Sequence, residues 1–143
     1  MDSLRIRPAA SGDAVALSRL LEQLGYPADA AEIPERIEKV QRTSGVTVLV
    51  AELGQQVVGL VTVHLLQSMH ASDPVAWLTT LVVDEVARGK GVGSALVGKA
   101  EAWAVSHGAR RISLTSALHR KQAHDFYKTR NYDQTGVRLT KIL

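Results

Sequence analysis

Residues 81–96 read LVVDEVARGKGVGSAL, and this stretch decides the fold. It begins with an apolar run, residues 81–83, that is typical of the buried end of a strand. A turn with alternate glycines follows, and from Gly91 the apolar spacing predicts a helix that runs to His107. Glycine lets the backbone approach a ligand closely, and the unpaired amides of a helix's first turn attract anions. The stretch therefore predicts a phosphate-binding turn between a strand and a helix.

Two cations inside this turn, Arg88 and Lys90, favour a phosphate ligand over a plain structural turn. A P-loop needs G-x-x-x-x-G-K-[ST], but Lys90 is followed by Gly91, and Asp84 stands where the first glycine should be. A dinucleotide site needs an acid about 20 residues further on. Residues 108–111 there read GARR and contain none. Both of these phosphate-binding classes are excluded by specific residues.

The flanking sequence alternates between strand and helix patterns. Strands are predicted over residues 4–8, 46–53, 56–66, 75–84 and 111–116, helices between Asp13 and Gly25, between Asp29 and Thr43, over 91–107 and over 121–130, and a last strand or two between Tyr132 and Leu143. Gly108 is expected to end the third helix. Gly59, inside a strand, is expected to mark a bulge or a close backbone approach. This order predicts a mixed α/β fold in one domain.

Length, cysteine content and charge exclude several classes of function. A length of 143 residues suits one domain, and the absence of cysteine excludes disulfides, thiolate zinc sites and a cysteine nucleophile. The N-terminus lacks the apolar region of a signal peptide and no apolar run could span a bilayer, so a cytoplasmic protein without a membrane segment is expected. The net charge of +3 suggests an anionic partner. Nucleic acid is disfavoured because few aromatic side chains are available for base stacking.

Two motifs resemble those of the GNAT N-acetyltransferases. Residues 88–93, RGKGVG, match that family's [Q/R]-x-x-G-x-[G/A] acetyl-CoA motif, and residues 123–132, AHDFYKTRNY, are similar to its A-x-x-F-Y-x-x-x-G-[FY] signature. The resemblance covers nearly the whole chain. It implies one GNAT-type domain over residues 1–143, with a central mixed, mostly antiparallel sheet flanked by about four helices. Asn131 replaces the usual glycine, and Arg120 replaces an asparagine that contacts the cofactor in many relatives.

The resemblance also implies an activity, the transfer of acetyl from acetyl-CoA to a primary amine by direct attack through a tetrahedral intermediate. The residues it implies for acetyl-CoA binding are Leu81, Val82, Val83, Arg88, Gly89, Lys90, Gly91, Val92, Gly93, Ser94, Ser116, Arg120 and Tyr127. A backbone amide of Val82 or Val83 is expected to polarise the thioester and hold the oxyanion. Tyr127 is expected to protonate the leaving thiolate as a general acid.

The sequence offers several candidates for the general base that takes the proton from the amine. Many relatives place a carboxylate on the strand before the turn, where this chain has Thr79-Thr80. His64 and His70 are the first candidates for the base, with Asp73 and His124 behind them, because histidine titrates near neutral pH. A metal site built from His64, His70 and Asp73 is disfavoured, because their spacing matches no standard ligand pattern.

The acceptor stays open at this level. The strand of His64, the helix start at Ala123-His124 and the tail at residues 138–141 resemble aminoalkylphosphonate acetyltransferases and favour a small amine. Aminoglycosides, polyamines and protein N-termini are alternatives, and a homodimer is left open. An acyl-CoA sensor without turnover is favoured by the missing carboxylate and disfavoured by Tyr127. A nucleic-acid-binding protein is suggested only by the sequence pI of about 9.4.

Overall fold

The computed structural model describes residues 3–116 and 121–143. The elements, in chain order, are β1 (Leu4–Pro8), the 3₁₀ helix η1 (Ser11–Asp13), α1 (Ala14–Leu24), η2 (Ala30–Glu32), α2 (Ile33–Arg42), β2 (Val46–Leu53), β3 (Gln56–Leu66), β4 (Val75–Val83), η3 (Glu85–Ala87), α3 (Val92–Ser106), β5 (Ile112–Leu114) and α4 (Lys121–Lys128). This order confirms the strands and helices predicted from residue 4 to residue 130.

The chain divides into two compact units, Met1–Ser113 and Leu114–Leu143. The sheet has the strand order β1-β2-β3-β4-β5, and the first four strands are antiparallel neighbours. At the start of β4, the Ala76 amide donates to the carbonyl of Arg111, just before β5 (2.9 Å). Because the two strands start side by side, β5 runs parallel to β4, and the sheet is mixed and mostly antiparallel, as expected.

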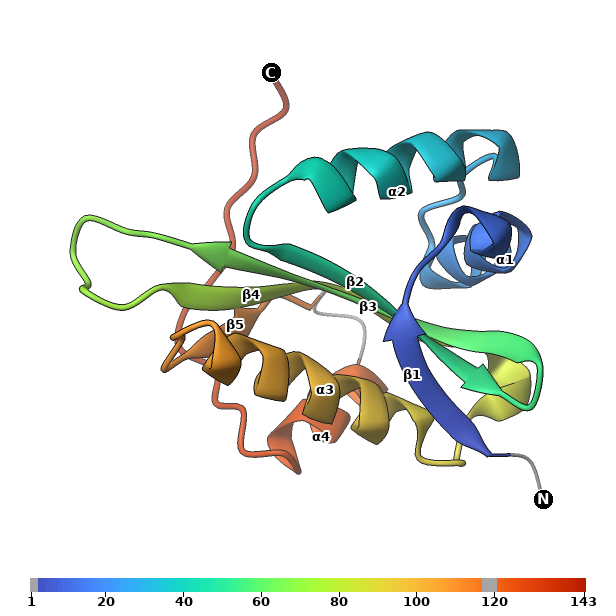
Figure 1. Cartoon of the computed structure of the whole chain (residues 1–143). Helices are drawn as coiled ribbons and strands as arrows, with labels where there is room; N and C mark the ends of the chain where they lie inside the picture. Colours follow the sequence, from blue (N-terminus) through green and yellow to red (C-terminus); the bar gives the residue numbers. More distant parts are fainter. Residues whose placement is uncertain (1–2, 117–120) are drawn as a thin grey trace. The chain divides into compact units, whose positions relative to one another are not determined.

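Helices cover both faces of the sheet in the first unit (Figure 1). Helices α1 and α2 lie on one face, over a core of buried side chains made of Ala9, Leu17, Leu20, Ile33, Ile37, Val50, Val57, Leu60 and Val82. Helix α3 lies on the other face and buries Val92, Leu96, Val97, Ala100 and Ala104. The two apolar layers hold the sheet rigid between them.

Gly59 fulfils both predictions made for it. The register of β2 and β3 shifts beside it, between Ala51 and Glu52. A Cβ on Gly59 would lie 2.8 Å from Cδ1 of Leu96 and 3.0 Å from Cγ1 of Val92. Only glycine lets the N-terminal half of α3 pack this closely on β3.

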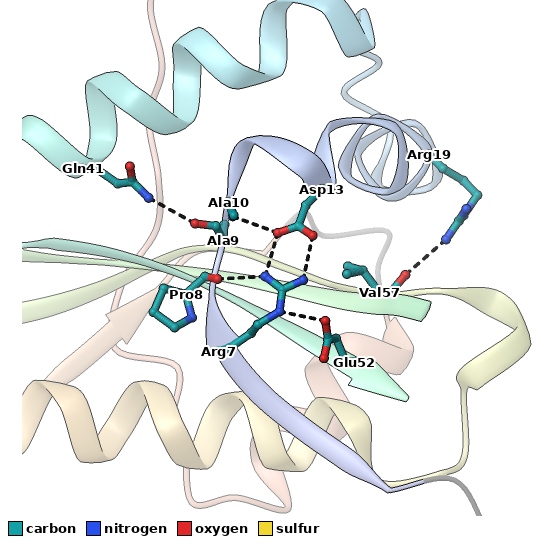
Figure 2. Close-up of polar contacts among 9 residues, drawn as sticks. All are labelled: Arg7, Pro8, Ala9, Ala10, Asp13, Arg19, Gln41, Glu52 and Val57. Atoms are coloured by element: carbon teal, nitrogen blue, oxygen red, sulfur yellow. Dashed lines mark hydrogen bonds and ion pairs between the residues drawn. The ribbon is translucent and has the colours of Figure 1, made fainter. Parts of the chain in front are cut away.

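A polar network ties the start of α1 to the edge of the sheet (Figure 2). Arg7 on β1 donates to both carboxylate oxygens of Asp13 (2.7 and 2.8 Å) and to Glu52 on β2 (2.8 Å). The hydrogen bond from Arg7 lowers the pKa of Asp13, against the opposing effect of burial, and the Ala10 amide lowers it further. The Asp13 side chain does not cap α1, because its carboxylate accepts from the Ala10 amide and pairs with Arg7 instead.

Three helices end as the local sequence predicts. Gly25, Gly108 and Asn131 all have positive φ (100°, 89° and 68°). After α4, the amide of Asn131 donates to the Lys128 carbonyl and that of Tyr132 to the Tyr127 carbonyl, which is the Schellman pattern. Asn131 therefore takes the left-handed position that glycine usually fills, a conformation that asparagine tolerates better than most residues.

The prediction of a last strand between Tyr132 and Leu143 is wrong. The described residues there form neither strand nor helix. The apolar side chains of this tail are 84–108% exposed, and they are Val137, Leu139, Ile142 and Leu143. A strand forms only where pairing and burial offset its loss of conformational entropy, and local β propensity does not supply either.

No helix among the described residues combines the length and the apolar character needed to cross a membrane.

Candidate active site

The predicted phosphate turn lies between β4 and α3 and is open to solvent. Gly89 and Gly91 both adopt the left-handed conformation (φ 80° and 79°). A Cβ on either residue would meet no atom within 4 Å, so the space beside the turn is empty. The side chains of Arg88 and Lys90 are exposed at the same turn. An open turn flanked by two cations is suited to an anion.

The N-terminus of α3 lies at this turn, and the residue at its N-cap position has no side chain that could cap it. This N-cap residue is Gly91, and the first turn of the helix contains no acidic residue. The first helical hydrogen bond runs from Ala95 to the Gly91 carbonyl (3.1 Å). The amides of Val92 and Gly93 precede that bond, so the helix offers them no carbonyl. With the helix dipole, these amides favour a bound phosphate.

Strand β4 directs backbone amides away from β3 just before the turn. The Asp84 amide donates to the Val58 carbonyl (2.8 Å), which makes residues 58 and 84 a hydrogen-bonded pair. Hydrogen-bonded pairs alternate along an antiparallel ladder, so Val82 bonds to β3 while Leu81 and Val83 point the other way. On that side, β5 has three residues and starts beside the start of β4. For the amide predicted to hold the oxyanion, the alternation therefore favours Val83 over Val82, and Leu81 is the other residue whose amide points away from β3.

A β-bulge separates this segment from the rest of β4. Thr62 pairs with Thr80 and Val63 pairs with Leu78, so Thr79 has no partner in the register. The Thr79 hydroxyl donates weakly to the Thr62 carbonyl (3.5 Å). A bulge bends its strand and re-aims the residues beyond it. The sequence pattern did not predict this bulge, although it falls on the two threonines that stand where relatives have a carboxylate.

Asp84, which ends β4, is a site residue that sequence reasoning missed. It is only 5% exposed, and it accepts hydrogen bonds from Arg19 (3.1 Å) and Gln23 (3.3 Å) of α1 and from the Val86 amide (3.3 Å). Burial acts to raise the pKa of Asp84, but the Val86 amide, Gln23 and the charge of Arg19 outweigh it and lower the pKa. An acid immediately before a helical turn is an available signal for the contact with Val86. The contacts with α1 leave no signal in the local sequence.

The candidate bases are not gathered at the turn. His64 pairs with Trp77, three residues along β3 from the Val61–Leu81 pair, which corresponds to roughly 10 Å. His70 is exposed in the loop between β3 and β4, which extends from the end of the sheet opposite the turn (Figure 1). Asp73 in the same loop pairs with Arg110 (3.6 Å). A role for these residues as bases therefore stays a prediction that requires a water chain.

The remaining predicted residues belong to the second unit or lie outside the described residues. Tyr127 and His124 are on α4, and Ser116 is half-buried two residues after β5. Tyr127 lies edge-to-face against Phe126 and Tyr132, and burial raises the pKa of its phenol to about 12. Arg120 lies outside the described residues. Among the residues that the structure describes, no three His, Cys, Asp or Glu side chains are grouped to hold a metal ion.

The comparisons with known proteins agree with this geometry. A profile of the acetyltransferase (GNAT) family matches residues 16–132. The chain is 34% identical over 88 residues to the aminoalkylphosphonate N-acetyltransferase of Salmonella typhimurium, a match that covers 62% of this chain and 57% of that protein. It is 28% identical over 134 residues to the aminoglycoside N(6′)-acetyltransferase type 1 of Stenotrophomonas maltophilia, covering 91% of this chain and 86% of the other.

A solved structure gives the same fold. The crystal structure of a protein named as a transcriptional regulator from Bacillus halodurans C-125 superposes with a TM-score of 0.90, covering 99% of this chain and all of the other at 21% identity. At that identity the likeness concerns the fold alone.

Proposed function

This chain belongs to the GNAT acetyltransferase family, which uses acetyl-CoA, and we propose that it transfers acetyl from acetyl-CoA to the primary amine of a small molecule. One observation in the structure carries the proposal. The N-terminus of α3, with its left-handed Gly89 and Gly91, is joined through the short helix η3 to a strand whose Leu81 and Val83 amides point away from β3. An anion site and two strand amides that point away from β3, a few residues apart, suit the two parts of a pantetheine diphosphate.

The turn and β4 have separate tasks in this proposal. The amides of Val92 and Gly93 and the charges of Arg88 and Lys90 hold the pyrophosphate. The backbone of Leu81 and Val83 pairs with the pantetheine arm, and one of their amides stabilises the negative charge that develops on the thioester oxygen.

The reaction then requires two proton movements. The amine nitrogen forms the new bond to the acetyl carbon and loses a proton, and the carbon–sulfur bond breaks to release the CoA thiolate. Tyr127 donates the proton that the thiolate takes up, since its phenol, with a pKa that burial raises to about 12, is protonated at neutral pH. His64 and His70 are the residues we propose to test first for removing the proton from the amine.

The acceptor class follows from the named relatives. The Salmonella protein is named for aminoalkylphosphonates and the Stenotrophomonas protein for aminoglycosides, and both of these classes carry primary amines. We therefore propose a small-molecule amine rather than a protein N-terminus, and a soluble cytoplasmic enzyme. Nucleic acid has no role in this proposal.

The proposal is tested first by binding. Acetyl-CoA at 100 times its dissociation constant should stabilise the protein by about 2.7 kcal/mol, because it binds only the folded state. Gly91→Val should abolish that stabilisation, since a branched side chain is strained at positive φ and would enter the empty space of the turn. Gly98→Val is the matched control, because Gly98 is exposed on α3 and a Cβ there meets nothing within 4 Å.

Turnover is then measured with a panel of amines that contains aminoalkylphosphonates, aminoglycosides and polyamines. Release of free CoA thiol with one of these classes is the expected result. No thermal shift with saturating acetyl-CoA would overturn the proposal. A thermal shift without turnover on any amine would indicate an acyl-CoA sensor rather than an enzyme.

A further inference from the structure

We propose that Gln23 and Arg19 of α1, together with Asp84, are positioning residues that hold the acetyl-CoA turn in place. The inference rests on the proposed function, and it assigns the alignment of the turn to three side chains that do not themselves touch the cofactor. None of the three belongs to either of the sequence motifs.

Gln23 bridges the end of β4 and the start of η3. Its amide nitrogen donates to the Asp84 carboxylate (3.3 Å), and its amide oxygen accepts from the Glu85 backbone (3.0 Å). The amide nitrogen and the amide oxygen of Gln23 thus bond to two consecutive residues of the segment that leads into the turn. Few other residue types could serve, because the position needs a donor and an acceptor on the same side chain.

Arg19, one turn earlier on α1, binds the same place. Its Nε donates to Asp84 (3.1 Å), and its Nη2 donates to the Val57 carbonyl at the start of β3 (3.2 Å; Figure 2). Asp84 therefore receives one hydrogen bond from each α1 side chain, in addition to the Val86 amide. Because Asp84 is buried, an unpartnered carboxylate at that position would be costly.

Apolar packing does not replace these polar contacts. A cleft of about 690 Å³ opens in this region and is lined from α1 and η3 as well as by residues of β1 to β3. Two apolar side chains at the cleft, Val15 of α1 and Val86 of η3, are 73% and 74% exposed, so they leave the space between α1 and η3 unfilled. The hydrogen bonds of Gln23 and Arg19 therefore supply the polar contacts between α1 and the residues that begin η3. They act beside the buried Ala87 of η3 and the bond from the Asp84 amide to the Val58 carbonyl.

The position of η3 determines that of the turn. Within this three-residue helix, the Ala87 amide donates to the Asp84 carbonyl (2.9 Å) and the Arg88 amide to the Glu85 carbonyl (3.4 Å). Arg88, the first residue of the turn, also donates from its side chain to the Val83 carbonyl (3.4 Å). A displacement of residues 84–85 would thus shift the cation of the turn and the amides that follow it.

The test compares two glutamines. Gln23→Ala removes both bridging hydrogen bonds. Gln41→Ala is the matched control, because Gln41 lies on α2 and its side chain donates to the Ala9 carbonyl (3.1 Å; Figure 2). Binding of CoA is measured by calorimetry, and steady-state kinetics separate the Michaelis constant for acetyl-CoA from turnover.

We expect Gln23→Ala to raise the dissociation constant for CoA and the Michaelis constant for acetyl-CoA about tenfold, while turnover at saturation stays within about twofold. Gln41→Ala should leave both constants within about twofold even if it lowers the melting temperature by the same amount. A Gln23→Ala/Asp84→Asn double variant should lose less affinity than the sum of the single changes, because the partners act as one unit.

Equal affinities in the two alanine variants would overturn the inference, as would additive losses in the double variant. The parent protein is measured first. If the parent does not bind CoA, the proposed function fails, whereas binding that is unchanged by Gln23→Ala removes only the positioning role.

Discussion

At the scale of single residues, Tyr127 shows how its surroundings determine its chemistry. Its ring lies 5.3 Å from Phe126 and 5.5 Å from Tyr132, measured between centroids, and burial raises the phenol pKa to about 12. A phenol with this pKa is protonated throughout the physiological range. It is also a weak acid relative to a thiol, whose ordinary pKa is about 8.5. We infer that its contribution lies at the lower end of what a general acid supplies.

Tyr127→Phe should lower turnover about 10²-fold at neutral pH and change CoA affinity by no more than a few-fold, because only the hydroxyl is lost. In the parent, turnover should show no fall from phenol ionisation below about pH 11, since the group titrates near pH 12. The measurement is the pH dependence of turnover in both proteins. Full activity in the variant would assign Tyr127 to packing alone.

Arg88 is predicted to act on binding rather than on the chemical step. Its contact with phosphate would be the same in the ground state and in the transition state, so Arg88→Ala should raise the Michaelis constant for acetyl-CoA and leave turnover nearly unchanged. Steady-state kinetics with Lys99→Ala, an exposed cation of α3 outside the turn, provide the control. A loss of turnover at an unchanged Michaelis constant would contradict this role.

At the scale of elements, the contact between α3 and β3 determines where the turn lies. The first buried residues of α3, Val92 and Leu96, pack against the bare backbone of Gly59. The same glycine pairs with Val83, the last residue of β4. Gly59 therefore contacts both the start of α3 and the end of β4. The turn joins these two elements, so this contact determines its place.

Gly59→Ala should therefore destabilise the protein by about 1–3 kcal/mol, because the new methyl group would lie 2.8 Å from Leu96 and overpack the interface. Gly98→Ala should instead stabilise it by about 0.5–1 kcal/mol, since that glycine lies in the exposed middle of α3. Chemical denaturation of both variants checks the pair. A neutral effect of Gly59→Ala would mean that α3 can move away from the sheet.

At the scale of the whole molecule, two buried carboxylates link stability to pH. Asp13 is 7% exposed and Asp84 is 5% exposed, and both have pKa values below those of an unfolded chain. For Asp13 the hydrogen bond from Arg7 is the main cause. For Asp84 burial opposes the shift, and the Val86 amide, Gln23 and Arg19 reverse it. Below about pH 4, the unfolded chain binds more protons than the folded one at these sites.

Both residues should therefore contribute stability that is fully present above about pH 4 and is lost as the pH falls through their folded-state pKa values. Asp13→Asn should lower the free energy of unfolding at pH 7 by about 1–3 kcal/mol and reduce its dependence on pH below 5. Glu35→Gln, which removes only an exposed ion pair with Lys39, should change it by less than about 0.5 kcal/mol. Denaturant titrations between pH 3 and 7 check both. The same acid dependence in Asp13→Asn and in the parent would contradict this account.

Features that depend on local conformation could be predicted from the sequence alone. The turn at residues 88–91 and the helix ends at Gly25, Gly108 and Asn131 were all placed correctly, because positive φ restricts the residue type at the position itself. Strand and helix order followed from periodicity for the same reason, since each period is a property of one segment. The family motifs of the turn and of α4 are likewise contiguous in the chain.

Features that depend on pairing between distant segments were decided only by the tertiary structure. The bulge at Thr79 and the outward direction of the Leu81 and Val83 amides depend on the register with β3, which no local pattern of β4 encodes. Asp84 is buried because Arg19 and Gln23, more than 60 positions earlier in the chain, supply its hydrogen bonds. The tail after Tyr132 has strand propensity but no strand, because pairing and burial, rather than propensity, stabilise a strand.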